Sequence, residues 1–265
     1  MTNWTSRTCA ANGIDIHYLR TGDDKPALIA LHGLTGSGAC WTPLARALED
    51  GYDVIMPSAR GHGASSAPSG GYRYCDLADD VIGLIDALGL TAPILLGHSM
   101  GGMTAAVVAS EMGTTFRSVI LADPTFLAPE RQREVYRSDV AEQHRRLLAR
   151  DKDEVLAEAR RRHPHRSSEL LDLIVDARLR TEISAFEVLT PPNPDYRELV
   201  KAIAVPSLLV IGDNGVVSVE TARELQGLNP HLSHEVIANA GHGLPYDKPD
   251  EFAAVVRSFL ATEIA

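Results

Sequence analysis

Short apolar runs alternate with longer amphipathic stretches along most of this chain. Five runs bounded by glycine, proline or aspartate predict buried strands over residues 27–31, 54–56, 94–96, 119–122 and 208–211. Between them, apolar positions at helical spacing predict helices over residues 40–49, 76–88 and 104–112. Strands that alternate with helices in this way form a mostly parallel sheet with helices on both faces, so we expect an α/β fold.

The alternation stops between residues 124 and 200. Apolar spacing in this segment predicts helices with no strand between them, over residues 131–150, 152–162 and 168–183. The segment ends near Pro191-Pro192-Asn193-Pro194, which cannot continue a helix. We therefore expect a core formed by residues 1–123 and 201–265, with residues 124–200 inserted into it as a helical cap.

Composition narrows the classes of partner. The 265 residues are 45% apolar, which suits one large core, and the formal net charge of -10 disfavours binding to the anionic backbone of a nucleic acid. The sequence has no secretory leader and no apolar run near the roughly 20 residues that span a bilayer, so we expect a cytoplasmic protein with no membrane partner. The oligomeric state stays open.

The three cysteines do not indicate a metal or a disulfide. Cys9, Cys40 and Cys75 are odd in number and lack the CxxC or CxxH spacing of a zinc site. We therefore expect reduced thiols and no metal centre.

The sequence Gly97-His98-Ser99-Met100-Gly101-Gly102 follows a predicted strand and leads into a predicted helix. A GxSxG sequence in this context forms a tight turn that projects the serine hydroxyl above the sheet. A serine hydroxyl needs a base to become a nucleophile near neutral pH. His242, which follows the strand-like residues 235–237 and precedes a predicted helix over residues 250–260, is the candidate base. His98 is expected only to line the pocket.

A third glycine-rich segment, His32-Gly33-Leu34-Thr35-Gly36-Ser37-Gly38, follows the strand over residues 27–31. Such a loop can present a backbone N–H group to a developing oxyanion without obstruction by side chains. We expect the N–H groups of Leu34 and Met100 to form this oxyanion hole together.

These segments, together with PSARGHGAS from Pro57 and AGHGLPYDKPDEF from Ala240, resemble the α/β-hydrolase superfamily over nearly the whole chain outside the cap. The resemblance implies a Ser-His-acid triad, an acyl-enzyme intermediate and no cofactor. It does not imply a substrate, because this fold supports many reactions. The loop sequence HGLTGSG, with an acid after the sixth strand of the family's sheet, is similar to acetamidomethylene-succinate hydrolases. The acid position is also similar to that of cofactor-free dioxygenases.

Two positions compete for the triad acid. Many family members carry an aspartate after the seventh strand, where this chain has Gly215, and Asp213 lies two residues earlier. The second family arrangement places the acid after the sixth strand, where this chain has Asp123. We assign Asp123, with Asp213 as the alternative and Asp247 as a third choice because it lies close to His242 in sequence.

The cap contains 14 basic and 15 acidic residues and is less acidic than the rest of the chain. Most of its arginines are explained by solvated helix faces. Arg178 is the exception, because it shares an apolar helical face with Leu171, Ile174 and Val175 and could bind a substrate carboxylate. Aromatic residues near the catalytic loops or in the cap are candidates to line an apolar pocket: Trp41, Phe126, Tyr136 and Phe186.

These features predict a serine hydrolase that cleaves an ester, lactone or amide in a small organic molecule. Hydrolysis of a C–C bond would use the same residues. Cofactor-free oxygenation, with His242 and its acid as the base, is a second alternative, and a ligand receptor on the same fold is a third. Haloalkane dehalogenase and epoxide hydrolase chemistry are disfavoured, because those relatives carry an aspartate at the position of Ser99.

Overall fold

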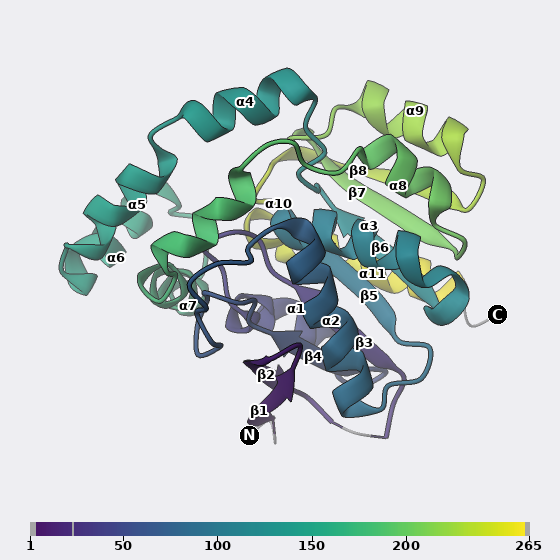
Figure 1. Cartoon of the computed structure of the whole chain (residues 1–265), viewed down its shortest axis with the longest axis horizontal. Helices are drawn as coiled ribbons and strands as arrows, with labels where there is room; N and C mark the ends of the chain where they lie inside the picture. Colours follow the sequence, from purple (N-terminus) through teal and green to yellow (C-terminus); the bar gives the residue numbers. More distant parts are fainter. Residues whose placement is uncertain (1–3, 23, 263–265) are drawn as a thin grey trace.

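A computed structural model describes residues 4–22 and 24–262, which form an eight-stranded sheet with helices on both faces (Figure 1). The strand order is β1-β2-β4-β3-β5-β6-β7-β8, and the strands from β4 to β8 are parallel. The predicted mostly parallel α/β sheet is confirmed. The strands are β1 (Thr5–Ala11), β2 (Ile14–Arg20), β3 (Ala27–Leu31), β4 (Asp53–Pro57), β5 (Ile94–His98), β6 (Ser118–Ala122), β7 (Ser207–Asn214) and β8 (Leu232–Gly241).

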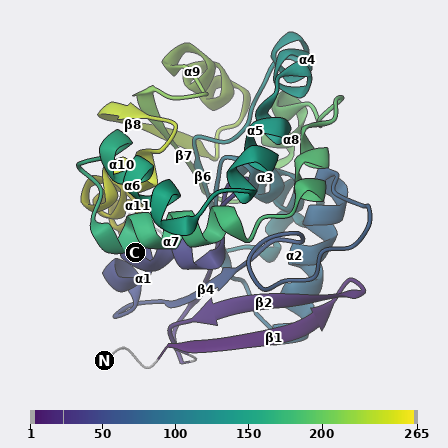
Figure 2. The same ribbon diagram turned by 90° about the vertical axis from the view of Figure 1, so that its left-hand side faces the viewer.

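The first two strands form an antiparallel hairpin that the apolar pattern did not predict. Figure 2 shows this hairpin along one edge of the molecule, where β2 also pairs antiparallel with β4. Asn12 and Gly13 connect the strands with φ values of 47° and 74°. An Asn-Gly pair favours the two-residue hairpin turn with positive φ at both positions, so this dipeptide was the available signal.

Helices cover the two faces of the sheet. On one face lie α2 (Tyr74–Leu88), α3 (Met100–Met112), α8 (Tyr196–Ala202) and α9 (Val219–Leu228), and on the other α1 (Thr42–Leu48), α10 (Leu244–Asp247) and α11 (Pro249–Thr262). Short 3₁₀ helices are η1 (Gly38–Trp41), η2 (Gly113–Thr115) and η3 (Ile183–Leu189). Within the described ranges, no helix has both the length and the apolar character needed to cross a membrane.

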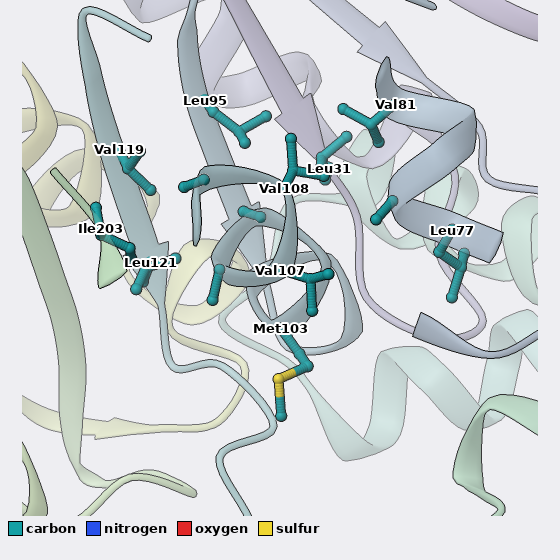
Figure 3. Packing of buried hydrophobic residues seen from close by; sticks show 14 of the residues in the cluster. Leu31, Leu77, Val81, Leu95, Met103, Val107, Val108, Val119, Leu121 and Ile203 are labelled. Atoms are coloured by element: carbon teal, nitrogen blue, oxygen red, sulfur yellow. The ribbon is translucent and has the colours of Figure 1, made fainter. Parts of the chain in front are cut away.

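Successive residues of the central strands belong to two separate cores. Leu95 packs with α2 and α3 on one face (Figure 3), whereas Leu96 packs with α1 and α11 on the other. All five residues of β5 are buried. This explains why the parallel strands appear in the sequence as continuous apolar runs rather than as alternating patterns.

Five α-helices lie between β6 and β7, and we call the first four the cap helices: α4 (Pro129–Arg137), α5 (Val140–Leu148), α6 (Lys152–Arg162) and α7 (Ser168–Leu179). The helix predicted over residues 131–150 is two helices, because the chain leaves the helical conformation at Ser138, which has φ -71° and ψ 166°. The helix predicted over residues 168–183 ends at Leu179. The next helix, α8, contains residue 200, the predicted end of the cap, and packs on α3.

Candidate active site

Ser99 lies in a strained turn between β5 and α3. Its backbone has φ 56° and ψ -118°, a conformation that residues other than glycine rarely adopt. A Cβ atom on Gly97 would overlap the carbonyl group of Gly101, and one on Gly101 would overlap the carbonyl group of Leu31. The glycines of the predicted GxSxG motif are therefore required by packing around the turn.

The side chains of Ser99, His242 and Asp123 form a continuous chain of hydrogen bonds. The Oγ atom of Ser99 lies 2.8 Å from Nε2 of His242, and Nδ1 of His242 lies 2.7 Å from Oδ2 of Asp123. Asp123 is fully buried, Ser99 is buried, and the side chain of His242 is 39% exposed. The three residues follow β5, β8 and β6, so the parallel strands bring their carboxyl ends to one edge of the sheet.

The backbone of the loop after β7 holds the Asp123 carboxylate. The N–H groups of Val216 and Val217 donate to its two oxygens over 2.8 and 2.9 Å. A Cβ atom on Gly215 would lie 2.7 Å from Oδ1 and 2.8 Å from Oδ2 of Asp123. The carboxylate thus occupies the space that a side chain at residue 215 would need, which gives a steric reason for glycine at the position where many family members carry their acid.

The two alternative acids have other partners. Asp213 accepts hydrogen bonds from the backbone N–H groups of Asn239 and Ala240, and these bonds tie β7 to β8 where their register shifts. Asp247 binds Arg166 and His165 through Oδ1, at 2.7 and 2.9 Å. Among the described residues, the His242 imidazole therefore has Asp123 as its carboxylate partner.

The glycine-rich loop after β3 lies against the nucleophile. A Cβ atom on Gly33 would be 3.0 Å from Cβ of Ser99, so the backbone of this loop passes close to the serine. Leu34 follows directly in the same loop and lines the cavity at Ser99. Met100 begins α3, where a backbone N–H group has no acceptor within its own helix. Both predicted oxyanion donors therefore belong to backbone segments next to Ser99.

Two buried histidines hold this loop in place, and the sequence predictions missed both of them. His32 donates from Nδ1 to the carbonyl oxygen of Gly33 over 2.8 Å and accepts the N–H group of Ala59 at Nε2 over 2.9 Å. His62 accepts the N–H group of Thr35 at Nε2 over 3.3 Å. Burial lowers the pKa of His32 to about 4 and that of His62 to about 3, so both are neutral near pH 7. Their glycine-rich motifs, HGLTGSG and RGHGAS, were the available signal.

His98 contacts both the backbone and the ring of His242. Its Nε2 atom lies 2.7 Å from the backbone carbonyl oxygen of His242, and their ring centroids are 4.9 Å apart. Burial, followed by the nearby His242, lowers the pKa of His98 to about 3. A neutral His98 must therefore carry its proton on Nε2 in order to donate to that carbonyl group.

A cavity of about 200 Å³ opens at the nucleophile. Its lining comes from the loop after β3, the serine turn, the loop after β8 and one cap helix, α7: Gly33, Leu34, Thr35, Gly36, Cys40, His98, Ser99, Ile174, His242, Gly243 and Tyr246. Of the predicted pocket residues, Leu34 and His98 are among these. Trp41 is buried behind the cavity, where its ring packs edge-on against His98 at a centroid distance of 6.5 Å.

Other predicted pocket residues lie away from this cavity. Phe126 stacks on Tyr196 at 5.0 Å within the core. Phe186 is buried beside His144. These positions differ from the prediction because an aromatic or apolar residue near a catalytic loop packs as well into the core as into a pocket.

Two cap residues also lie apart from Ser99. Tyr136 is 53% exposed in the last turn of α4, a helix anchored by Gln132, which binds the carbonyl oxygen of Leu127 and the N–H group of Asn193. Arg178 lines a second cavity inside the cap. Helical spacing placed Arg178 on the inward face of α7, but it did not show which cavity this face lines.

One cluster of described side chains has the composition of a metal site. Ligand atoms of His163, His165 and Asp247 lie within 4.8 Å of one another. The guanidinium group of Arg166 donates to Oδ1 of Asp247 over 2.7 Å. A fixed positive charge on that oxygen opposes binding of a cation, so the arrangement is better explained as a polar contact between the cap and α10.

Comparison with known proteins identifies the family of this chain. The family model described as alpha/beta hydrolase fold matches residues 26–249. The chain is 30% identical to N-formylmaleamate deformylase of Pseudomonas putida over 95% of this chain and 94% of the relative. It is 27% identical to 2-(acetamidomethylene)succinate hydrolase of Mesorhizobium japonicum over 91% and 90%. The crystal structure of an N-formylmaleamic acid deformylase from Pseudomonas putida superposes with a TM-score of 0.82 at 23% identity, covering 95% of this chain and 100% of that one.

The chain therefore belongs to the α/β-hydrolase family. Its similarity to the two named hydrolases confirms the resemblance inferred from the HGLTGSG, GHSMGG and AGHGLPYDKPDEF segments.

Proposed function

We propose that this protein is a serine hydrolase that cleaves an ester, lactone or amide bond in a small organic molecule. The observation that carries the proposal is the hydrogen-bonded chain from Ser99 Oγ through His242 to Asp123, with distances of 2.8 and 2.7 Å. A nucleophile, a base and a carboxylate that orients the base are the parts that acyl transfer requires. The relatives N-formylmaleamate deformylase and 2-(acetamidomethylene)succinate hydrolase support hydrolysis as the reaction class.

In this mechanism, His242 takes the proton of Ser99 as Oγ attacks the substrate carbonyl carbon. The N–H groups of Leu34 and Met100 stabilise the oxyanion that forms. The tetrahedral intermediate collapses, the leaving group departs with the proton from His242, and an acyl-enzyme remains. Water then gives a proton to His242 and attacks the acyl carbon, and Ser99 regains its proton from His242 as the acid is released. Asp123 holds the imidazole in the required tautomer and stabilises its cation.

The cavity supports a small substrate. Its volume is about 200 Å³, and Ile174 of the cap forms part of its wall. Pockets that enclose drug-sized ligands have volumes of roughly 300–1,000 Å³. We therefore expect an acyl group of only a few carbon atoms, and the cap would obstruct a polymer.

Labelling with a fluorophosphonate, which reacts with activated serines, tests the proposal. Intact mass and peptide mapping should place one adduct on Ser99 in the wild type and in Ser110→Ala, a control on the same helix. Ser99→Ala and His242→Ala should stay unlabelled while they keep the circular dichroism spectrum of the wild type. An unlabelled, folded wild-type protein would exclude the acyl-enzyme mechanism and favour base-only oxygen chemistry or a binding role.

A further inference from the structure

The cap encloses a cavity of about 120 Å³ between α5, α6 and α7, separate from the one at Ser99. Part of its lining is apolar, from Leu147, Val155, Leu171 and Val175, which belong to a small core of the cap. The rest is strongly basic. Four arginines and one glutamate line it: Arg150, Arg162, Arg166, Arg178 and Glu158.

Three of the four arginines have carboxylate partners. Arg150 and Arg162 both bind Glu158, at 2.6 and 2.5 Å, so one acidic group serves two cations. Arg150 also lies 4.0 Å from Glu154. Arg166 binds Asp247 of α10. The positive charge of Arg178 is not balanced in this way.

The side chain of Arg178 has no hydrogen-bond or ion-pair partner among the described residues, and its Nε atom is buried. Burial and the nearby Arg162 lower its pKa from the usual range, which shows that the surroundings disfavour the charge. A desolvated guanidinium group without a counter-charge is costly, so an anion that bound beside it would be favoured. The planar fork of arginine matches a carboxylate especially well.

We propose that the cap cavity is a binding site for a small carboxylate, whose two oxygens pair with the guanidinium group of Arg178. The apolar walls select a carboxylate attached to a short hydrocarbon chain over phosphate, because phosphate has no apolar part to bury. Ile174 lines both this cavity and the one at Ser99. The carboxylate therefore comes either from a free acid or from the distal end of a substrate that is bound at Ser99.

Titration of the full chain with butyrate tests the site without any need for turnover. In buffers of matched ionic strength, we expect butyrate to raise the Tm of the wild type with concentration, whereas the neutral isostere butyramide has no effect. Arg178→Met keeps an unbranched apolar side chain, shorter than that of arginine, and removes the charge, so it should fold and weaken butyrate binding at least tenfold. Arg160→Met is the matched control, because Arg160 is half exposed on α6 and does not line the cavity.

The opposite results overturn the proposal. Equal binding of butyrate to the wild type and to Arg178→Met would remove Arg178 from the site, and equal binding of butyrate and butyramide would show that only the apolar walls act. Stronger binding of phosphate than of butyrate would overturn the choice of a carboxylate. Absence of any butyrate binding would exclude the site.

A kinetic comparison then identifies the source of the carboxylate. If the site holds the distal carboxylate of a substrate, monomethyl glutarate should be hydrolysed with a KM at least tenfold below that of dimethyl glutarate, and Arg178→Met should abolish this difference. If butyrate binds but the two esters have equal KM values, the site serves a free acid. The butyrate titration does not depend on the serine mechanism, so failure of either proposal can be recognised separately.

Discussion

The edge of the sheet and the cap hold their charged side chains in different ways. At the edge of the sheet, Asp123 is fully buried, and two backbone N–H groups and one imidazole bind it. In the cap, most charged groups pair on exposed helix surfaces, as in Arg145 with Glu142, whose side chains are 59% and 43% exposed. The edge of the sheet is therefore expected to tolerate almost no change in shape, whereas the surface of the cap should tolerate many substitutions.

The largest expected effect concerns the acid of the site. We expect Asp123→Asn to lower kcat about 10⁴-fold, because the amide cannot stabilise the imidazolium ion and favours the wrong tautomer of His242. Asp213→Asn, which alters the bonds to the backbone of β8, should stay within about threefold of the wild type. Steady-state hydrolysis of an aryl ester measures both. A larger loss for Asp213→Asn than for Asp123→Asn would reverse the assignment.

The next effect tests the steric role of Gly215. Its Cβ position lies 2.7 Å from the Asp123 carboxylate, so Gly215→Ala should push the acid away from His242. A displacement of roughly 1 Å in a catalytic group costs about 10²-fold in rate. Gly227→Ala is the control, since nothing lies within 4 Å of its Cβ position. An unchanged kcat for Gly215→Ala would show that the loop after β7 can move to accommodate the methyl group without displacing Asp123.

Acid should destabilise the edge of the sheet through its buried histidines. An unfolded histidine has a pKa of about 6.5, whereas the pKa is about 4 for His32 and about 3 for His62 and His98. Below pH 6.5 these histidines bind protons in the unfolded chain but stay neutral in the folded chain. The free energy of unfolding therefore decreases as the pH falls towards the folded-state pKa values. Each residue should lower the free energy of unfolding by up to about 2 kcal/mol between pH 7 and 5.

Urea unfolding at pH 8, 7, 6 and 5 measures this dependence. His62→Gln should flatten it, whereas His234→Gln, at a partly exposed position, should leave it unchanged. A pH dependence that is the same in all three proteins would assign the effect to other groups.

The smallest effect belongs to the surface of the cap. Glu142→Gln removes exposed ion pairs with Arg145 and Arg146, and we expect it to leave the free energy of unfolding unchanged within the error of measurement, because water and salt screen these charges. Thermal unfolding in low and high salt measures this difference. A clear loss of stability that disappears in high salt would mean that the cap depends on its surface charge pairs.

The local pattern of apolar residues was sufficient to predict much of the core. The strands over residues 27–31 and 119–122 were predicted to within one residue, because a buried parallel strand is a short apolar run wherever it lies in the sheet. Ser99 and His242 were predicted from their positions after strands, and Asp123 from what the family resemblance implies, and the structure brings the three within hydrogen-bond distance. The carboxyl ends of parallel strands meet at one edge, so position along the chain was informative there.

Other features depend on which distant segments meet. Gly215 and Asp123 are 92 residues apart in the sequence, and only their contact explains why one lacks a side chain. The buried histidines of the glycine loops, the unpaired charge of Arg178 and the exposure of Tyr136 likewise follow from packing between elements. The sequence by itself determined the central parallel strands, the helices between them, and Ser99 and His242 at the edge of the sheet, because hydrophobic period and turn chemistry are local. The tertiary structure decided the cap and the neighbours of each buried polar group, because these depend on contacts between residues far apart in the chain.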